Sequence, residues 1–266
     1  MLEINSNNEQ SATFSFAEIL KEADGEQDFT HLDEVSSLLA TRFNGGSKVA
    51  VAVPVFEAAR EVLDSLDGLA PDDSVGTVAR LDRFLSGVFG HEYLTSKGGI
   101  FAEFAVMKAI RDTVGCGVEM PSTEDDMHGV DLWVDISAEE DGSEMLALQI
   151  KYTARFGDGD DDPQAIFALL DDKKGLDDLM LYLGVGKKEE TKDLIRRMGK
   201  MDDYVKMKES KDGAPKYRVA YLALSNHYSW FDKRTGQPNK RLTDFLSENI
   251  LDNLVYGEQP KGDQND

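Results

Sequence analysis

Two neighbouring segments with a period of two constrain the fold of this chain most. Residues 130–136 place Asp131 on one side of a strand and apolar side chains at every second position on the other. Residues 145–152 do the same with Gln149 and Lys151. Such alternation is typical of a β-strand with one buried face. The stretch between them is short, polar and contains glycine, so we expect a hairpin that brings Asp131 beside Gln149 and Lys151.

A strongly apolar segment precedes these strands. Residues 98–110 begin with two glycines, which we expect to break any earlier helix, and then read as a helix that is apolar nearly all round. Such a helix should be buried. Glu103 lies within it, and a buried Glu is normally neutral, ion-paired or bound to a metal because burying an unpaired charge is costly. The ordinary alternative is a Glu103 that points outward at the end of the helix.

These motifs resemble those of the PD-(D/E)XK nucleases, the superfamily of restriction-endonuclease-like folds. The resemblance rests on Glu103 in the helix, Gly129-Val130-Asp131 after the His128-Gly129 turn, and Gln149-Ile150-Lys151 on the second strand. It implies an α/β fold with a mixed sheet, namely an αβββαβ core over roughly residues 97–226. The chain departs from the family pattern in having Gln149 where an acid is commonest and in lacking a proline before Asp131. Active members with Gln in that place occur.

The resemblance implies a nuclease that hydrolyses DNA phosphodiester bonds with Mg²⁺ or Mn²⁺. Its catalytic residues would be Glu103, Asp131, Gln149 and Lys151, and its metal ligands Asp131, Glu103, Gln149 and the carbonyl of Ile150. The chemistry suits these residue types, because oxygen ligands hold a hard cation that neutralises phosphate and activates water. The Lys151 ammonium would orient the water or stabilise charge on phosphorus. The alternative is an ordinary ion pair between Asp131 and Lys151 on a solvated sheet face.

Charge is unevenly distributed along the chain. The net charge of −22 argues against a generic nucleic-acid binder. Residues 187–241, however, contain 15 basic and 8 acidic residues and form a basic block. We expect this block to face DNA, although an ordinary charged helix face would have the same composition. The candidate nucleic-acid-binding residues are Lys187, Lys188, Arg196, Arg197, His227, Tyr228, Lys233 and Arg234.

Aromatic and basic residues interleave in residues 225–234, as base stacking and phosphate binding would require. Aromatic side chains that cap the core are an equally good interpretation. We expect His128 and His227 to be hydrogen-bonding loop residues rather than metal ligands, and four histidines in the whole chain argue against a zinc site.

The remaining pattern predicts two domains, a helical one over residues 1–95 and the nuclease-like one over residues 96–266. The first dozen residues are polar and are expected to be frayed. The N-terminal elements expected are helices at 14–23, 32–43, 55–66 and 75–89 and a short strand at 49–53.

Downstream of Lys151 we expect an acidic loop at 156–163 that lacks the spacing of a calcium-binding EF-hand. The further elements expected are helices at 163–170, 176–183, 187–208 and 242–254, with Gly175 as a helix breaker and a strand at 216–224.

Cys116 is the only cysteine, which excludes an internal disulfide framework and suits a reducing compartment. The start of the chain has no signal-peptide pattern, and the longest apolar run, residues 49–56, is too short for a bilayer. We therefore expect a soluble cytoplasmic protein with no membrane partner. A homo-oligomer, or a partner bound by residues 1–95, stays open.

Three functions follow, with a DNA endonuclease of restriction or repair type first. The second is a catalytically silent core of the same fold that binds DNA or a partner, which Gln149 makes plausible. The third is an acidic interaction protein, such as a DNA mimic or inhibitor, which the net charge of −22 favours.

Overall fold

The chain forms two compact units, and each is described by itself. One comprises Met1–Lys97 with Lys233–Gly236, and the other comprises Gly98–Asp232 with Gln237–Asp266. The computed structural model describes residues 2–5, 11–14, 30–46, 51, 55, 58, 59, 62, 71–137, 143–153, 164–182, 188–211 and 213–255.

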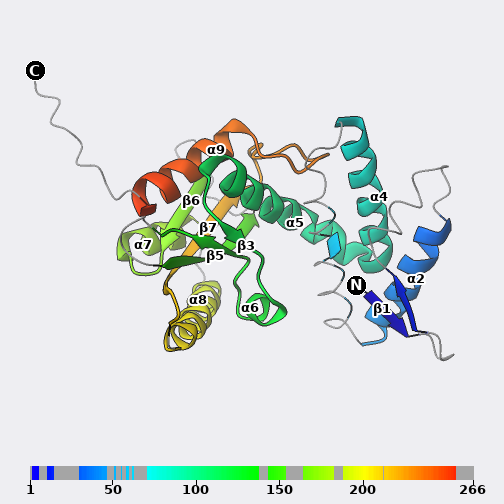
Figure 1. Ribbon diagram of the computed structural model, residues 1–266, viewed down its shortest axis with the longest axis horizontal. Helices are drawn as coiled ribbons and strands as arrows, with labels where there is room; N and C mark the ends of the chain where they lie inside the picture. Colours follow the sequence, from blue (N-terminus) through cyan, green and yellow to red (C-terminus); the bar gives the residue numbers. More distant parts are fainter. Residues whose placement is uncertain are drawn as a thin grey trace, which may run out of the picture. The chain divides into compact units, whose positions relative to one another are not determined.

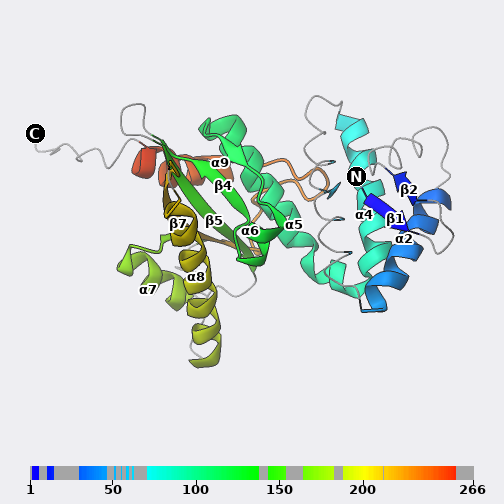
Figure 2. The ribbon, with the colours of Figure 1, turned by 60° about the horizontal axis from the view of Figure 1, so that its bottom comes forward.

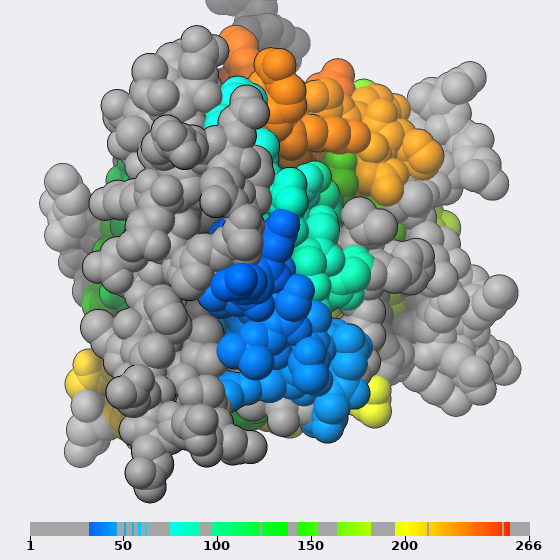
Figure 3. Space-filling model, turned by 90° about the vertical axis from the view of Figure 1, so that its right-hand side faces the viewer, coloured from blue at the N-terminus to red at the C-terminus, as the bar shows by residue number. Residues whose placement is uncertain are grey.

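The first unit packs helix α2 (Thr30–Asn44) against helix α4 (Pro71–Phe89). The rings of Phe43 and Phe89 meet edge to face with centroids 5.1 Å apart. Gly87 permits the close approach of the helices, because a Cβ there would lie 2.5 Å from the hydroxyl oxygen of Ser36. Figure 3 shows α2, in blue, at the surface of this unit.

The N-terminal residues differ from the sequence-based expectation. Strands β1 (Leu2–Asn5) and β2 (Ser11–Phe14) pair antiparallel, so the expectation of a frayed N-terminus was wrong for residues 2–5, 11 and 12, and the rest of the first dozen lies outside the described residues. Val51 is helical rather than part of the expected strand. Both predicted helices at 32–43 and 75–89 are confirmed as α2 and α4. Of the helix predicted at 55–66, residues 55, 58, 59 and 62 are helical, whereas residues 15–23 of the first predicted helix lie outside the described part of the chain.

The second unit is built on a five-stranded mixed sheet with the order β3-β4-β5-β7-β6. Its strands are β3 (Val118–Glu119), β4 (Leu132–Asp135), β5 (Glu144–Thr153), β6 (Ala165–Leu169) and β7 (Lys216–Ser225). The pair β4 and β5 is antiparallel, as predicted, and so are β3 with β4 and β6 with β7, whereas β5 and β7 are parallel. The chain is therefore of the mixed α/β class.

Helices cover both faces of this sheet (Figures 1 and 2). Helices α7 (Lys173–Tyr182) and α8 (Lys188–Glu209) pack on the face that carries Ala147, Tyr221 and Ala223. Helix α5 (His91–Ala109), which ends in the π-helical turn η1 (Ile110–Val114), lies on the other face with α9 (Lys240–Leu246) and the π-helix η2 (Ser247–Val255). The predicted helices at 187–208 and 242–254 are thus present, the second as two consecutive segments.

Helix α5 runs without interruption through Gly98 and Gly99, so the expected helix break was wrong. The physical reason for Gly98 is a tertiary contact. A Cβ at Gly98 would lie 2.8 Å from the ring of Tyr152 on β5, closer than Cβ atoms approach their neighbours. Glycine therefore lets α5 lie against the sheet rather than ending it.

The region after β5 also differs from expectation. Residues 165–169 form strand β6, where a helix at 163–170 was predicted, because this short apolar run pairs along β7 from Ala165 opposite Leu224 to Leu169 opposite Ala220. Gly175 lies inside α7 rather than breaking a helix. The predicted acidic loop at 156–163 lies outside the described residues. None of the helices in the described ranges is both long and apolar enough to cross a membrane.

Candidate active site

Asp131 lies directly before β4 and makes two hydrogen bonds with the main chain of β5. Its backbone N–H donates to the carbonyl of Leu148 at 2.9 Å, and its Oδ2 accepts from the backbone N–H of Ile150 at 2.6 Å. The register pairs Leu132 with Leu148, so Asp131 falls opposite Gln149 on the same face of the sheet. The structure thus brings the Gly-Val-Asp and Gln-Ile-Lys motifs together.

Gln149 packs on the turn that leads into Asp131. Gly129 has a φ of 90°, a conformation that favours glycine, and a Cβ there would lie 3.1 Å from Nε2 of Gln149. The glycine of the motif is thus required both for the backbone conformation and for room beside the amide. His128 makes the hydrogen bond expected of a loop residue, since its Nδ1 lies 2.8 Å from the carbonyl oxygen of Glu124.

Lys151 is exposed and lies on the same strand face as Gln149, opposite Ala223 of β7. Nearer the start of β5, helix α8 covers this face, and Trp133, which lies beside Ala147, is only 5% exposed. An ordinary ion pair between Asp131 and Lys151 was expected on a solvated sheet face, but only part of this face is exposed to solvent. It opens to solvent at the end of β5 that carries Lys151.

Glu103 is half-buried on α5, although every other residue from Phe101 to Ile110 is buried. Helix α5 packs on the sheet face opposite to that of α8. The role of Glu103 in the site stays a prediction.

The oxygen atoms at and near Asp131 are of the type that binds Mg²⁺, but only the Asp131 carboxylate among them carries a negative charge. The N–H and the carbonyl of one strand residue point to the same side, so the Ile150 carbonyl faces the β4 side together with the N–H that binds Asp131. A carboxylate, an amide oxygen and a backbone carbonyl are hard ligands. In the part of the chain that the structure describes, no three His, Cys, Asp or Glu side chains lie close enough to hold a metal ion.

Tyr221 is a neighbour of this site that sequence reasoning missed. It lies on β7 opposite Gln149 and is 5% exposed. Burial, reinforced by the negative charge of Asp131, raises the pKa of Tyr221 to about 12, while Arg197 opposes the shift. Tyr221 belongs to a continuous apolar strand in the sequence, and that pattern did not indicate that it lies beside Gln149.

Sequence reasoning also missed a buried polar cluster beneath α8. Asp125 of α6 (Thr123–Met127) accepts hydrogen bonds from the N–H and hydroxyl of Ser122, at 2.8 and 2.6 Å, through Oδ2. Its Oδ1 accepts from the Tyr204 hydroxyl and the Lys208 ammonium, each at 2.7 Å. Burial alone would raise the pKa of Asp125, but the bonds from Lys208, Ser122 and Tyr204 outweigh it and hold that pKa well below its usual range.

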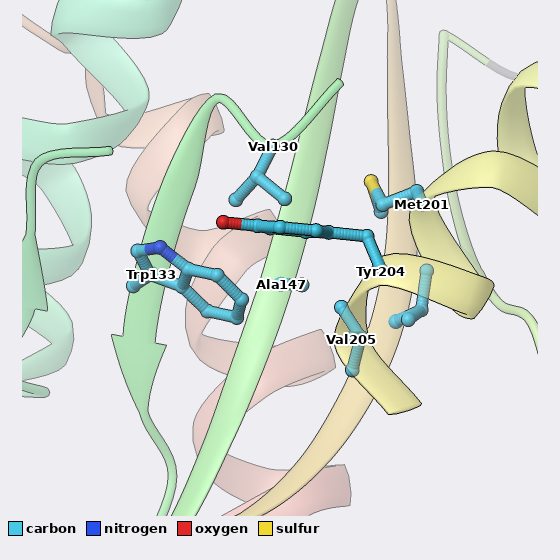
Figure 4. Packing of buried hydrophobic residues seen from close by; sticks show 7 residues of the cluster. Val130, Trp133, Ala147, Met201, Tyr204 and Val205 are labelled. Carbon is cyan, nitrogen blue, oxygen red and sulfur yellow. The ribbon is translucent and has the colours of Figure 1, made fainter. Parts of the chain in front are cut away.

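Apolar and aromatic groups enclose this cluster. Figure 4 shows the Tyr204 ring reaching from α8 over the sheet towards Val130 and Trp133. The His128 ring stacks on the Tyr204 ring at a centroid distance of 4.1 Å. The Lys208 ammonium lies 4.8 Å from the ring centroid of Trp133, a cation–π contact. Only the capping pattern of Ser122 and Asp125 could have been read from the sequence.

The candidate nucleic-acid-binding residues fall on α8 and on the segment after β7. Arg196 and Arg197 are exposed on α8, Lys188 begins that helix, and Lys187 lies outside the described residues. After β7, the exposed candidates are His227, Lys233 and Arg234, and Tyr228 is half-buried. The structure therefore leaves the described candidate arginines accessible to a ligand.

The other aromatic residues of this segment cap the core, as the alternative interpretation proposed. Trp230 and Phe231 are 2% and 3% exposed, and the Trp230 indole N–H donates to the Ser225 carbonyl at 2.8 Å. Tyr228 instead lies near a cation, with the Arg241 guanidinium 5.3 Å from its ring centroid. Of the aromatic candidates in this segment, only His227 and Tyr228 have rings that are not buried in the core, and their contact with bases stays a prediction.

No family model, curated protein or solved structure matches the chain.

Proposed function

We propose that this protein is a metal-dependent nuclease that hydrolyses DNA phosphodiester bonds. The observation that carries the proposal is the 2.6 Å hydrogen bond between Asp131 and the Ile150 N–H, which joins the acidic motif to the Gln149-Ile150-Lys151 strand. Asp131, Gln149 and the Ile150 carbonyl would hold Mg²⁺ or Mn²⁺, with Glu103 as the expected fourth ligand. When bound, the cation would neutralise the phosphate and lower the pKa of the attacking water.

The order of elements supports a restriction-endonuclease-like core. Helix α5 is followed by the antiparallel strands β3, β4 and β5, then by α7 and α8, and finally by β7 parallel to β5. With the short helix α6 between β3 and β4 and the strand β6 at the edge next to β7 as additions, this order is consistent with the αβββαβ order expected of that superfamily. The proposed site lies where β4 begins beside β5.

The remaining residues have separable roles in the proposal. The exposed ammonium of Lys151 would stabilise charge that develops on the phosphate in the transition state. Arg196 and Arg197 on α8 would contact DNA phosphates, which position the duplex without reading its sequence.

A catalytically silent DNA-binding protein of the same fold is the second candidate. The specific observation in its favour is Gln149, which leaves Asp131 as the only acid in the two strand motifs. An acidic DNA mimic is the third candidate, and the net charge of −22 is the observation that favours it.

Incubation of the purified protein with supercoiled plasmid in Mg²⁺, Mn²⁺ or EDTA tests the proposal. We expect nicking with either metal and none in EDTA. Binding without nicking, weakened steeply by added salt, would favour the silent protein, because phosphate contacts release counterions. A DNA mimic would neither bind nor cut the plasmid.

A further inference from the structure

The main chain of Asp125 shapes the turn that leads to the proposed site. Its carbonyl accepts from the N–H groups of His128 and Val130, at 3.0 and 3.1 Å, and the Gly129 N–H donates to the Asp126 carbonyl at 2.9 Å. The conformation of the backbone between α6 and Asp131 therefore depends on the position of Asp125.

Helix α8 holds Asp125 from the other side. Tyr204 and Lys208 both bind its Oδ1, and Val130 is fully buried in the cluster formed by Met201, Tyr204 and neighbouring apolar residues. A buried carboxylate that accepts four hydrogen bonds is fixed in one orientation. A continuous series of contacts thus runs from α8 through Asp125 and Val130 to the next residue, Asp131.

We propose that Asp125, held by Tyr204 and Lys208, is a positioning residue that sets the Asp131 carboxylate against the Ile150 N–H. The inference rests on the proposed nuclease function for its biological meaning. Its structural content is independent of activity, because the bond between Asp131 and Ile150 exists in the free protein. Loosening the link to α8 releases the turn and weakens that bond.

The Ile150 amide proton reports directly on this bond. A proton donated to a carboxylate is shifted downfield, so its NMR shift in the free protein measures how well Asp131 is placed. Tyr204→Phe removes one hydroxyl and retains the ring that stacks on His128 and packs on Val130. Lys206→Ala is the matched control, since Lys206 lies on the same helix in an exposed ion pair with Asp202.

We expect the Ile150 amide proton to move upfield in Tyr204→Phe and to be unchanged in Lys206→Ala. Should Tyr204→Phe not fold, Lys208→Met at a partly exposed position removes the other donor to Oδ1 and is expected to give the same upfield movement. A folded Tyr204→Phe or Lys208→Met protein with the wild-type Ile150 shift would overturn the inference. A wild-type protein that does not cut DNA would overturn the nuclease proposal and leave this result untouched.

Discussion

The carboxylate of Asp131 and the backbone N–H of Ile150 lie 2.6 Å apart, across the boundary between two adjacent strands. The bond fixes the side chain of one motif to the main chain of the other. It also leaves Gln149 and Lys151, the residues on either side of Ile150, on the sheet face that Asp131 shares.

Gln149→Glu should increase metal affinity. The amide supplies an oxygen but no charge, and a carboxylate of nearly the same shape adds a formal negative charge beside Asp131. We expect tighter Mg²⁺ binding by calorimetry and a nicking rate equal to or above that of the wild type. Without metal, the two neighbouring carboxylates should repel each other and lower the melting temperature. Weaker Mg²⁺ binding in the variant would show that position 149 is not a ligand.

Lys151→Ala should lose about 10²- to 10³-fold in single-turnover cleavage rate, the usual effect of removing one preorganised electrostatic group. The affinity for DNA should change little, because the ammonium acts on the transition state. Lys173→Ala removes the same charge from an exposed position on α7, outside the basic block, and should cut at the wild-type rate. Cleavage by Lys151→Ala at the rate of the control would contradict a catalytic role for this strand.

Asp125→Asn should destabilise the protein in a pH-dependent way. Breaking a buried charge pair costs about 3 to 5 kcal/mol, and we expect a loss near the lower value at pH 7 because Lys208 is partly exposed. The pKa of Asp125 is lowered in the folded protein, so its contribution is present above the unfolded pKa, about 4, and is lost as the pH falls further towards the folded pKa.

Urea unfolding of both proteins at pH 7 and at pH 3 measures this difference. The gap in unfolding free energy should be larger at pH 7 and should shrink at pH 3. A gap of equal size at both pH values would mean that the Asp125 charge is not what stabilises the cluster.

Gly98→Ala and Gly99→Ala should change stability in opposite directions. Alanine is favoured over glycine in a helix by about 1 kcal/mol, and a Cβ at Gly99 meets nothing within 4 Å, so Gly99→Ala should be more stable than the wild type by about that amount. A Cβ at Gly98 meets the Tyr152 ring, and such overpacking costs about 1 to 3 kcal/mol. Thermal melts showing equal stabilisation by both substitutions would disprove the contact between α5 and Tyr152.

The sequence predicted the parts of the fold that depend on local periodicity. The alternation around Asp131 and Gln149 was enough to predict β4, β5 and their antiparallel pairing, because one face of each strand is apolar. It could not assign β6, since the short run at 165–169 fits a buried helix or a strand equally well and only pairing with β7 decides between them.

Tertiary contacts account for what the sequence could not show. Gly98 reads as a helix breaker unless Tyr152, far along the chain, is known to lie against it. Asp125 and Tyr204 are 79 residues apart, and the capping pattern of Ser122 and Asp125 does not involve Tyr204, so their hydrogen bond had no sequence signal. The closeness of Asp131 to Gln149 was predictable, whereas the support of Asp131 from α8 was not.

Single-turnover cleavage of plasmid by the wild type and by Asp131→Asn, in Mg²⁺ and under identical conditions, tests the central claim most directly. Asparagine retains an oxygen that can accept from the Ile150 N–H, so the fold should be kept while the charge that holds the metal is lost. We predict metal-dependent nicking by the wild type and none by the folded variant. Nicking by Asp131→Asn at the wild-type rate would contradict the assignment of this site.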